Sequence, residues 1–220
     1  MSLKEGFSGK LDSTSSDDGL SNFISINDDG GAAIYDELQV EPFYPVPVWK
    51  WIIPDEDVIK RTLEAVLKIR NDGMESQARS NFNGWQSSDD LHHRDEFKEI
   101  TNMLLNIGET QVHPSSWECI GMWAGINGKG AGNHVHYHEG VLSGTIWLKS
   151  ESNQTGGLVF IDPRTRHPLS GPKGKEIFQT NNKGYFPQVG MGVMFPSWLE
   201  HFVQANETDT ERVSLSFNLV

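Results

Sequence analysis

A short apolar strand that begins with glycine, a proline turn and a histidine follow one another in residues 190–201, GMGVMFPSWLEH. An earlier stretch has the same form, since Gly130 is followed by His136 and then by His138. Alternate side chains of a strand share one face, so His136 and His138 are expected to point the same way. His201 then supplies a third imidazole from a distant part of the chain.

The chain after Pro114 consists of short apolar or alternating runs separated by Gly, Asn and Pro. The runs are 117–126, 134–138, 143–149, 158–161, 189–195, 201–203 and 213–220. Many short strands with frequent turn signals indicate a β-sandwich or a barrel-like jelly roll. The two glycine-to-histidine stretches also resemble the paired motifs of the cupin superfamily. The predicted fold is mainly β with flanking helices, a double-stranded β-helix (jelly roll, cupin-like).

Two regions are predicted along the chain. Residues 1–43 are rich in Ser, Gly and Asp and are expected to form a flexible acidic leader, because they hold too little apolar surface to offset the entropy of ordering. Residues 44–220 are expected to form the jelly-roll domain, with helices at about 55–70 and 94–107 and a β core over 115–220.

Glycine and proline set further boundaries. The Pro- and Trp-rich run 44–51 predicts an entry strand at a sheet edge, since proline cannot donate a ladder hydrogen bond. Gly73 is expected to end the first helix, and Gly108 is expected to follow the second as its C′ residue.

Composition excludes several functions. Lys plus Arg is 18 and Asp plus Glu is 30, which gives a formal net charge of −12. So acidic a chain is a poor binder of phosphate backbones and anionic membranes, and nucleic acid and membrane partners are not expected. Cys119 is the only cysteine, so no intrachain disulfide or four-thiolate metal site can form, and a cytoplasmic location is expected.

The histidines predict a metal centre. Imidazole suits zinc, iron, copper or nickel, and three such ligands can meet if His201 comes beside His136 and His138. His134 lies on the same strand, either as a partner of a ligand or facing solvent, and neighbouring Glu139 is expected to point the opposite way.

The last strand predicts an anion site. Arg212, Ser214, Ser216 and Asn218 share one face, which looks either to solvent or into an inner pocket. A guanidinium beside a hydroxyl is a good receptor for a small carboxylate, because the planar fork binds it bidentately. The plainer alternative is an arginine and a serine exposed at a sheet edge.

Together these residues resemble one family, the 2-oxoglutarate/Fe(II)-dependent dioxygenases that carry a His-x-His motif followed by a Ser-Gly strand. The resemblance covers about residues 46–220. Its motifs are SN at 80–81, GWQS at 84–87, MWA at 122–124, HYH at 136–138, LSG at 142–144, GGLVFIDPR at 156–164, FPSWLEH at 195–201 and RVSLSFN at 212–218.

The resemblance implies an enzyme that couples oxidative decarboxylation of 2-oxoglutarate to hydroxylation of a substrate. His136, His138 and His201 would be the catalytic iron ligands, Arg212 would anchor 2-oxoglutarate, and Ser214 would assist. The implied cofactors are Fe(II) and 2-oxoglutarate, with O₂ and a small-molecule or peptide substrate as partners. A homodimer is left open.

Two departures from the family pattern stand out. The wider superfamily places Asp or Glu where this chain has His138, and Ile146 and Trp147 stand where the family often has paired tyrosines. Two alternatives therefore remain. One is a three-His dioxygenase or isomerase of the cupin type that does not use 2-oxoglutarate, and the other is a non-catalytic metabolite-binding jelly roll.

Overall fold

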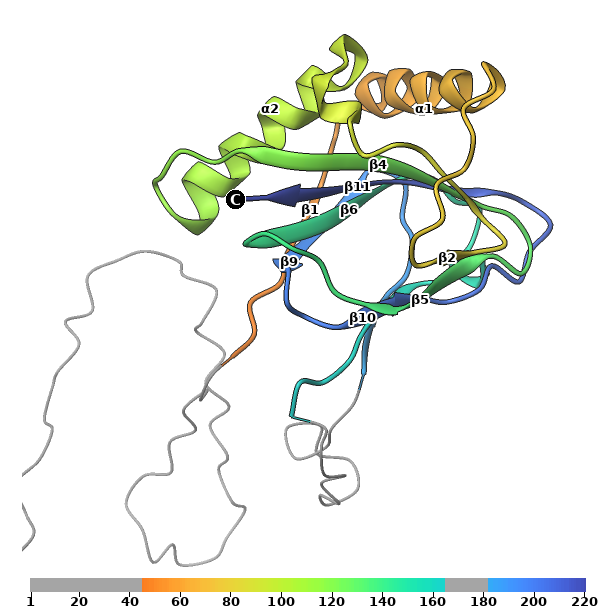
Figure 1. Cartoon of the computed structure of the whole chain (residues 1–220). Coiled ribbons are helices and arrows are strands. Elements are labelled where there is room, and N and C mark those ends of the chain that lie inside the picture. The colour runs from red at the N-terminus through yellow and green to blue at the C-terminus, as the bar shows by residue number, and fades with distance from the viewer. Residues whose placement is uncertain (1–44, 165–181) are drawn as a thin grey trace, which may run out of the picture. The chain divides into compact units, whose positions relative to one another are not determined.

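The computed structural model describes residues 45–164 and 182–220. The predicted leader, 1–43, lies outside them. Two antiparallel β-sheets face each other, and two helices cover the outer face of the larger sheet (Figure 1). None of the helices in the described residues has the length and apolar character needed to cross a membrane.

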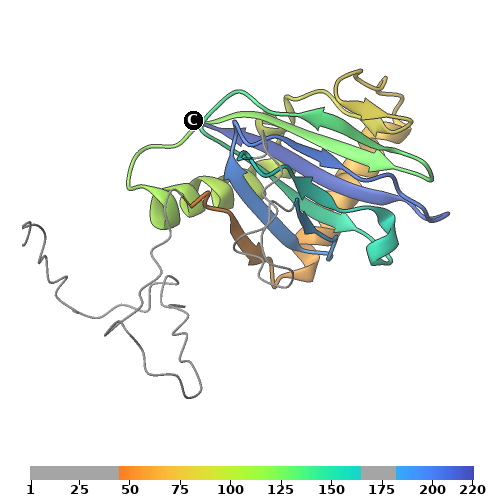
Figure 2. The same ribbon diagram turned by 90° about the horizontal axis from the view of Figure 1, so that it is seen from below.

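The larger sheet has six strands in the order β1-β9-β6-β11-β4-β3, which Figure 2 shows lying side by side. Their bounds are Trp49–Ile52 for β1, Met191–Pro196 for β9, Leu142–Lys149 for β6, Arg212–Leu219 for β11, Cys119–Asn127 for β4 and Trp85–Gln86 for β3. β1 lies at an edge, as the prolines before it predict.

The smaller sheet has five strands in the order β2-β5-β10-β7-β8. They are Asn81–Phe82 (β2), Gly132–His136 (β5), His201–Val203 (β10), Leu158–Phe160 (β7) and Lys183–Tyr185 (β8). From β4 to β7, and again from β9 to β11, the chain alternates between the two sheets. This alternation is that of a double-stranded β-helix, so the predicted fold class is confirmed.

The first helix agrees with the sequence prediction. α1, Glu56–Asn71, begins after Asp55, whose carboxylate accepts hydrogen bonds from the backbone N–H of Asp57 at 2.9 Å and of Val58 at 3.3 Å. Gly73 follows with φ +92°, the left-handed conformation that favours glycine at a helix end.

The second helix begins later than predicted but ends at the predicted residue, Ile107. Two 3₁₀ turns, Leu91–His93 and Asp95–Phe97, precede α2, Lys98–Ile107. The expectation that Gly108 is a C′ residue is wrong, since its φ is −55° and the chain continues as a π-helix over Gly108–Val112. Packing explains the glycine, because a Cβ there would lie 2.9 Å from Cγ of Trp117.

Strand β11 separates the apolar core from the space between the sheets. Its odd-numbered residues, Val213, Leu215, Phe217 and Leu219, are fully buried in the core under the helices. The even-numbered residues from Arg212 to Asn218 look the other way and line a cavity. Of the two alternatives that alternation left open, the inner pocket is therefore the correct one.

Candidate active site

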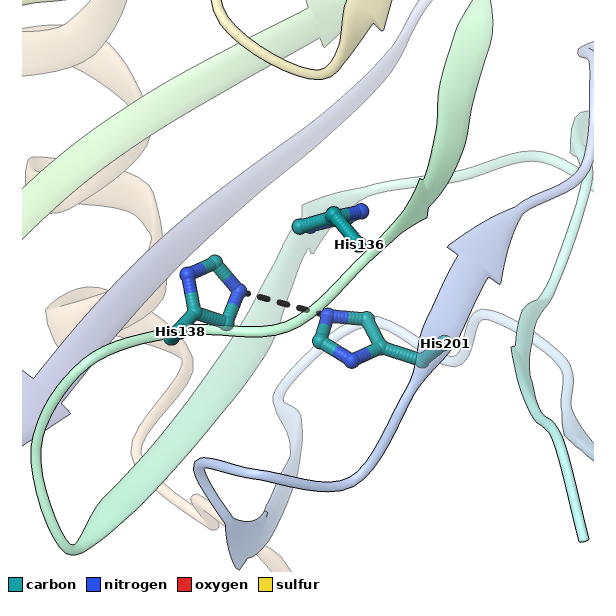
Figure 3. A group of neighbouring side chains, drawn as sticks. All are labelled: His136, His138 and His201. Carbon is teal, nitrogen blue, oxygen red and sulfur yellow. Dashed lines mark hydrogen bonds between the residues drawn. The ribbon is translucent and has the colours of Figure 1, made fainter. Parts of the chain in front are cut away.

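Three imidazoles meet in the smaller sheet, at the point where β5 ends and the neighbouring strand β10 begins (Figure 3). His136 is the last residue of β5 and His201 the first of β10, and the two residues pair across the strands. His138 lies two residues beyond β5, and its Nε2 is 3.3 Å from Nε2 of His201. One ring nitrogen from each of the three lies within 4.8 Å of the others.

Backbone carbonyls fix the tautomers of two rings. Nδ1 of His136 is 2.6 Å from the carbonyl oxygen of His134, and Nδ1 of His201 is 2.8 Å from that of Leu199. A carbonyl only accepts, so both Nδ1 atoms carry the proton, and both Nε2 atoms present a lone pair. This is the arrangement that a metal-binding imidazole needs.

Burial keeps the rings neutral. It lowers the pKa of His201 to about 3 and of His138 to about 4, and in both the neighbouring His136 lowers the pKa further. Burial also lowers the pKa of His136, although the hydrogen bond to His134 opposes this shift. Three unprotonated imidazoles that converge on one point form a donor set that fits a divalent first-row metal.

The neighbouring candidates stay outside the cluster. The ring of His134 packs against Phe82, with centroids 4.8 Å apart, and the side chains of His134 and Glu139 are exposed. His134 contributes its carbonyl oxygen to the cluster rather than its ring.

The imidazoles open into a cavity of about 400 Å³ between the sheets. Strand β11 lines it with Arg212, Ser214, Ser216 and Asn218. Its tryptophans are Trp85, Trp123 and Trp147. The ring centroid of Trp123 lies 5.4 Å from that of His138.

Arg212 is a buried cation in this cavity, only 2% exposed. Its Nη1 donates to the carbonyls of Thr155, of Gly156 at 2.7 Å and of Gln204 at 3.4 Å. With the Asn127 amide oriented to satisfy both of its polar atoms, Oδ1 of Asn127 accepts from Nη2 of Arg212 at 2.9 Å.

No carboxylate balances this charge, since none of the ion pairs formed within residues 45–164 and 182–220 includes Arg212. Burial lowers the pKa of Arg212 to about 10, so it remains protonated at neutral pH. The donors at Nε and at the second N–H of Nη2 have no acceptor among the described residues.

The structure therefore brings all five predicted site residues to one cavity. It also adds residues that sequence reasoning missed, Asn127 and the carbonyls of Thr155 and Gly156. Asn127 was detectable, because it shares the inward face of β4 with Trp123. For the carbonyls of Thr155 and Gly156, the only sign in the sequence was the glycine at 156. Its φ is +86°, and a Cβ there would lie 2.7 Å from Nη1 of Arg212.

A double-stranded β-helix that gathers three imidazoles and a buried arginine in one cavity has the layout of the 2-oxoglutarate- and Fe(II)-dependent oxygenases. Residues 121–218, from β4 to β11, match the family model described as "Putative 2OG-Fe(II) oxygenase". This match confirms the resemblance stated from sequence. The same match, with the three-imidazole donor set, bears out the predicted cofactors, Fe(II) and 2-oxoglutarate.

Several solved structures share this fold. The epimerase SnoN from nogalamycin biosynthesis, in complex with Fe³⁺ and alpha ketoglutarate, has a TM-score of 0.63 at 12% identity over 80% of this chain and 79% of its own. A Pseudomonas putida prolyl-4-hydroxylase has a TM-score of 0.58 at 12% identity over 79% and 92%. HygX from Streptomyces hygroscopicus, with nickel and 2-oxoglutarate bound, has a TM-score of 0.53 at 11% identity. The likeness covers 77% of this chain and 82% of HygX.

These identities establish a common fold and no more. No sequence among curated proteins matches the chain significantly.

Proposed function

We propose that this protein hydroxylates its substrate at the expense of 2-oxoglutarate, with His136, His138 and His201 holding Fe(II) and with Arg212 and Ser214 holding the co-substrate. The observation that carries the proposal is Arg212, a buried cation without a carboxylate partner in the described residues, lining the same cavity as three neutral imidazoles. A buried charge is costly unless it is paired, so the site favours an anionic ligand.

The charges of the site match those of the co-substrate. Three neutral imidazoles cancel none of the charge of Fe(II), whereas a carboxylate at the position of His138 would cancel one unit. The metal and Arg212 together thus carry three positive charges, two from the metal and one from Arg212. A dicarboxylate that reaches both groups would neutralise two of them, and the guanidinium fork suits its far carboxylate.

The chemistry of the proposed reaction comes from the cofactors. Bound iron, with 2-oxoglutarate and O₂, supplies the oxidation: one oxygen atom enters a C–H bond of the substrate to give C–OH, and the other enters succinate as CO₂ leaves. The protein binds and orients. Arg212 fixes the far carboxylate of the co-substrate, and Ser214, which lines the cavity on the same face of β11, donates a further hydrogen bond.

The remaining cavity residues orient the substrate and exclude water. Ser216 donates to Oγ1 of Thr145 at 3.3 Å, and Ser143 donates to Oδ1 of Asn218 at 2.8 Å, so the polar row on β11 is held in place by β6. Trp147, only 2% exposed, pairs with Ser214 across the sheet and lines the cavity beside this polar row.

An anaerobic titration tests the binding part of the proposal. Protein loaded with Fe(II) is titrated with 2-oxoglutarate, and we expect the visible charge-transfer band of a chelated keto acid. Glutarate has both carboxylates but no keto group, so it is the matched control and should give no band. A stoichiometric iron site that shows no band with 2-oxoglutarate would contradict the proposal.

Labelled oxygen tests the hydroxylation itself. For each compound that stimulates decarboxylation of 2-oxoglutarate, the reaction is run under ¹⁸O₂. Hydroxylation predicts one ¹⁸O atom in the oxidised product and one in succinate. A product formed without oxygen insertion, as in an epimerisation or a ring closure, would contradict hydroxylation while leaving the oxygenase class intact.

The all-imidazole donor set also favours a second candidate, a three-His dioxygenase that needs no keto acid. Oxygen uptake by the iron-loaded protein separates the two. Uptake that requires 2-oxoglutarate supports the first function, and substrate-dependent uptake without it supports the second.

A further inference from the structure

The mouth of the cavity carries a separate pair of charges. Apart from Arg212 and the neutral histidines, the ionisable lining residues among those described are Arg79, Asp89 and Tyr137. Tyrosine is uncharged at neutral pH, so one cation and one anion remain, and both Arg79 and Asp89 are exposed. The proposed function uses neither.

The two charges come from different segments of the chain. Arg79 precedes β2 on the side of the smaller sheet, where the carbonyl of the next residue, Ser80, accepts from the backbone N–H of His134 at 2.9 Å. Asp89 lies against the larger sheet, where its carbonyl accepts from the backbone N–H of Met122 in β4 at 2.8 Å. A molecule that enters the cavity therefore meets a guanidinium from one segment and a carboxylate from another.

Neither side chain forms a close ion pair in the described part of the chain, although burial lowers the pKa of His92 and the Asp89 carboxylate, acting at longer range, opposes this shift. Across residues 45–164 and 182–220, no ion pair within 4.0 Å includes Arg79 or Asp89. The adjacent acid, Asp90, differs: it pairs with Arg94 at 3.6 Å and accepts a hydrogen bond from Ser88. Asp89 thus keeps its carboxylate for a ligand while its neighbour has a structural role.

Trp123 adds an aromatic surface to the cavity that Asp89 lines. Trp123 follows Met122, the residue bonded to Asp89, and its half-buried ring lines the cavity. An ammonium group gains from a carboxylate and also from the face of an indole ring. Within this cavity the carboxylate of Asp89 and the indole of Trp123 therefore suit an amine, and the guanidinium of Arg79 suits a carboxylate.

We infer that the substrate is a small zwitterion, a free amino acid whose ammonium group binds at Asp89 and Trp123 and whose carboxylate binds at Arg79. This inference rests on the proposed function and names its substrate class. A residue within a peptide chain has neither charge. The cavity volume of about 400 Å³ lies near the lower end of small-ligand pockets, and it must also hold the co-substrate, which favours a small molecule.

Binding to the loaded protein tests the inference. The wild-type protein, made anaerobic with Fe(II) and 2-oxoglutarate, is titrated with the twenty free L-amino acids and with their N-acetyl amides. The readouts are calorimetry and the shift of the charge-transfer band. We expect at least one free amino acid to bind, and its N-acetyl amide to bind at least about tenfold more weakly, since hydrogen bonds to charged groups contribute roughly 1.5–3 kcal/mol each.

Three variants locate the contacts. Asp89→Asn and Arg79→Gln should each weaken binding of that amino acid about tenfold or more, and each should leave the affinity for 2-oxoglutarate unchanged. Asp90→Asn is the matched control, because this carboxylate pairs with Arg94 and does not line the cavity, and it should change neither affinity.

Two outcomes would overturn the inference alone: the band forms but no free amino acid binds, or the blocked amides bind as tightly as the free forms. A wild-type protein that gives no band overturns the proposed function, and this inference falls with it.

Discussion

The two ends of the cavity, the histidine cluster and Arg212, differ in charge although both are buried. At one end, burial drives the protons off His138 and His201, whose pKa values fall to about 4 and about 3. At the other, burial lowers the pKa of Arg212 only to about 10, so the guanidinium keeps its charge. The first end is therefore prepared for a cation and the second for an anion. Iron and a dicarboxylate match these needs in the same order.

Both ends share one means of support. Backbone carbonyls orient His136 and His201 through Nδ1, and the carbonyls of Thr155, Gly156 and Gln204 hold Nη1 of Arg212. Carbonyl oxygens accept hydrogen bonds without adding a negative charge. Each group is thus fixed in direction while its capacity to bind an oppositely charged ligand is kept.

Removing one imidazole should have the largest effect. We expect His201→Ala to abolish stoichiometric iron binding, because two ligands that remain cannot complete the set. Colorimetric iron analysis after desalting measures this. His134→Ala is the matched control, since it deletes a ring on the same sheet but keeps the carbonyl that orients His136. Full iron content in a folded His201→Ala protein would move the metal site elsewhere.

Removing the buried cation should have the next largest effect, and on the co-substrate alone. Arg212→Ala should raise the KM for 2-oxoglutarate about 100-fold while iron still binds, because truncating one partner of a buried charge pair costs roughly 2–5 kcal/mol. Steady-state decarboxylation kinetics measure the change.

Arg70→Ala is the control for Arg212→Ala, since Arg70 pairs with Glu211 at 2.6 Å and does not line the cavity. An unaltered dependence on 2-oxoglutarate in Arg212→Ala would assign the co-substrate to another cation.

A carboxylate placed beside Arg212 should neutralise its charge and so weaken the difference between the two ends of the cavity. Asn127→Asp places a carboxylate where Oδ1 now lies 2.9 Å from Nη2 of Arg212. The new carboxylate competes with the co-substrate, so the KM for 2-oxoglutarate should rise about tenfold while iron affinity stays the same. Steady-state decarboxylation kinetics give the KM, and isothermal titration of the iron-free protein with Fe(II) gives the iron affinity. Unchanged affinity for 2-oxoglutarate would mean that the charge of Arg212 is not what binds it.

Removing the assisting hydroxyl should have the smallest effect. Ser214→Ala deletes one neutral donor from β11, worth about 1 kcal/mol, so we expect the KM for 2-oxoglutarate to rise about fivefold. The same kinetic assay, run beside Arg212→Ala, ranks the two residues. A larger loss from Ser214→Ala than from Arg212→Ala would reverse the roles given to them.

The sequence predicted what depends on local periodicity. Alternation along β11 placed Arg212 and Ser214 on one face, and the opposite face proved to be the core. The alternation of apolar and polar residues could not reveal β2 and β3, because each has only two residues and is defined by the strand with which it pairs. Alternation could not place His138 either, since β5 ends at His136. The backbone N–H of His138 donates instead to the carbonyl of Ser197, in the turn after β9, at 2.9 Å.

Contacts between distant segments were also beyond the sequence. The hydrogen bond between Asn127 and Arg212 joins two strands far apart in the chain, and the charged mouth depends on how the loops around Arg79 and Asp89 lie against different sheets. Such features follow from strand order, which no local pattern encodes.

A crystal structure of the protein grown anaerobically with Fe(II) and 2-oxoglutarate is the most direct test of the account. We expect the metal bonded to Nε2 of His136, His138 and His201, with the far carboxylate of 2-oxoglutarate against the guanidinium of Arg212. Iron bound elsewhere, or a co-substrate whose far carboxylate lies away from Arg212, would contradict it.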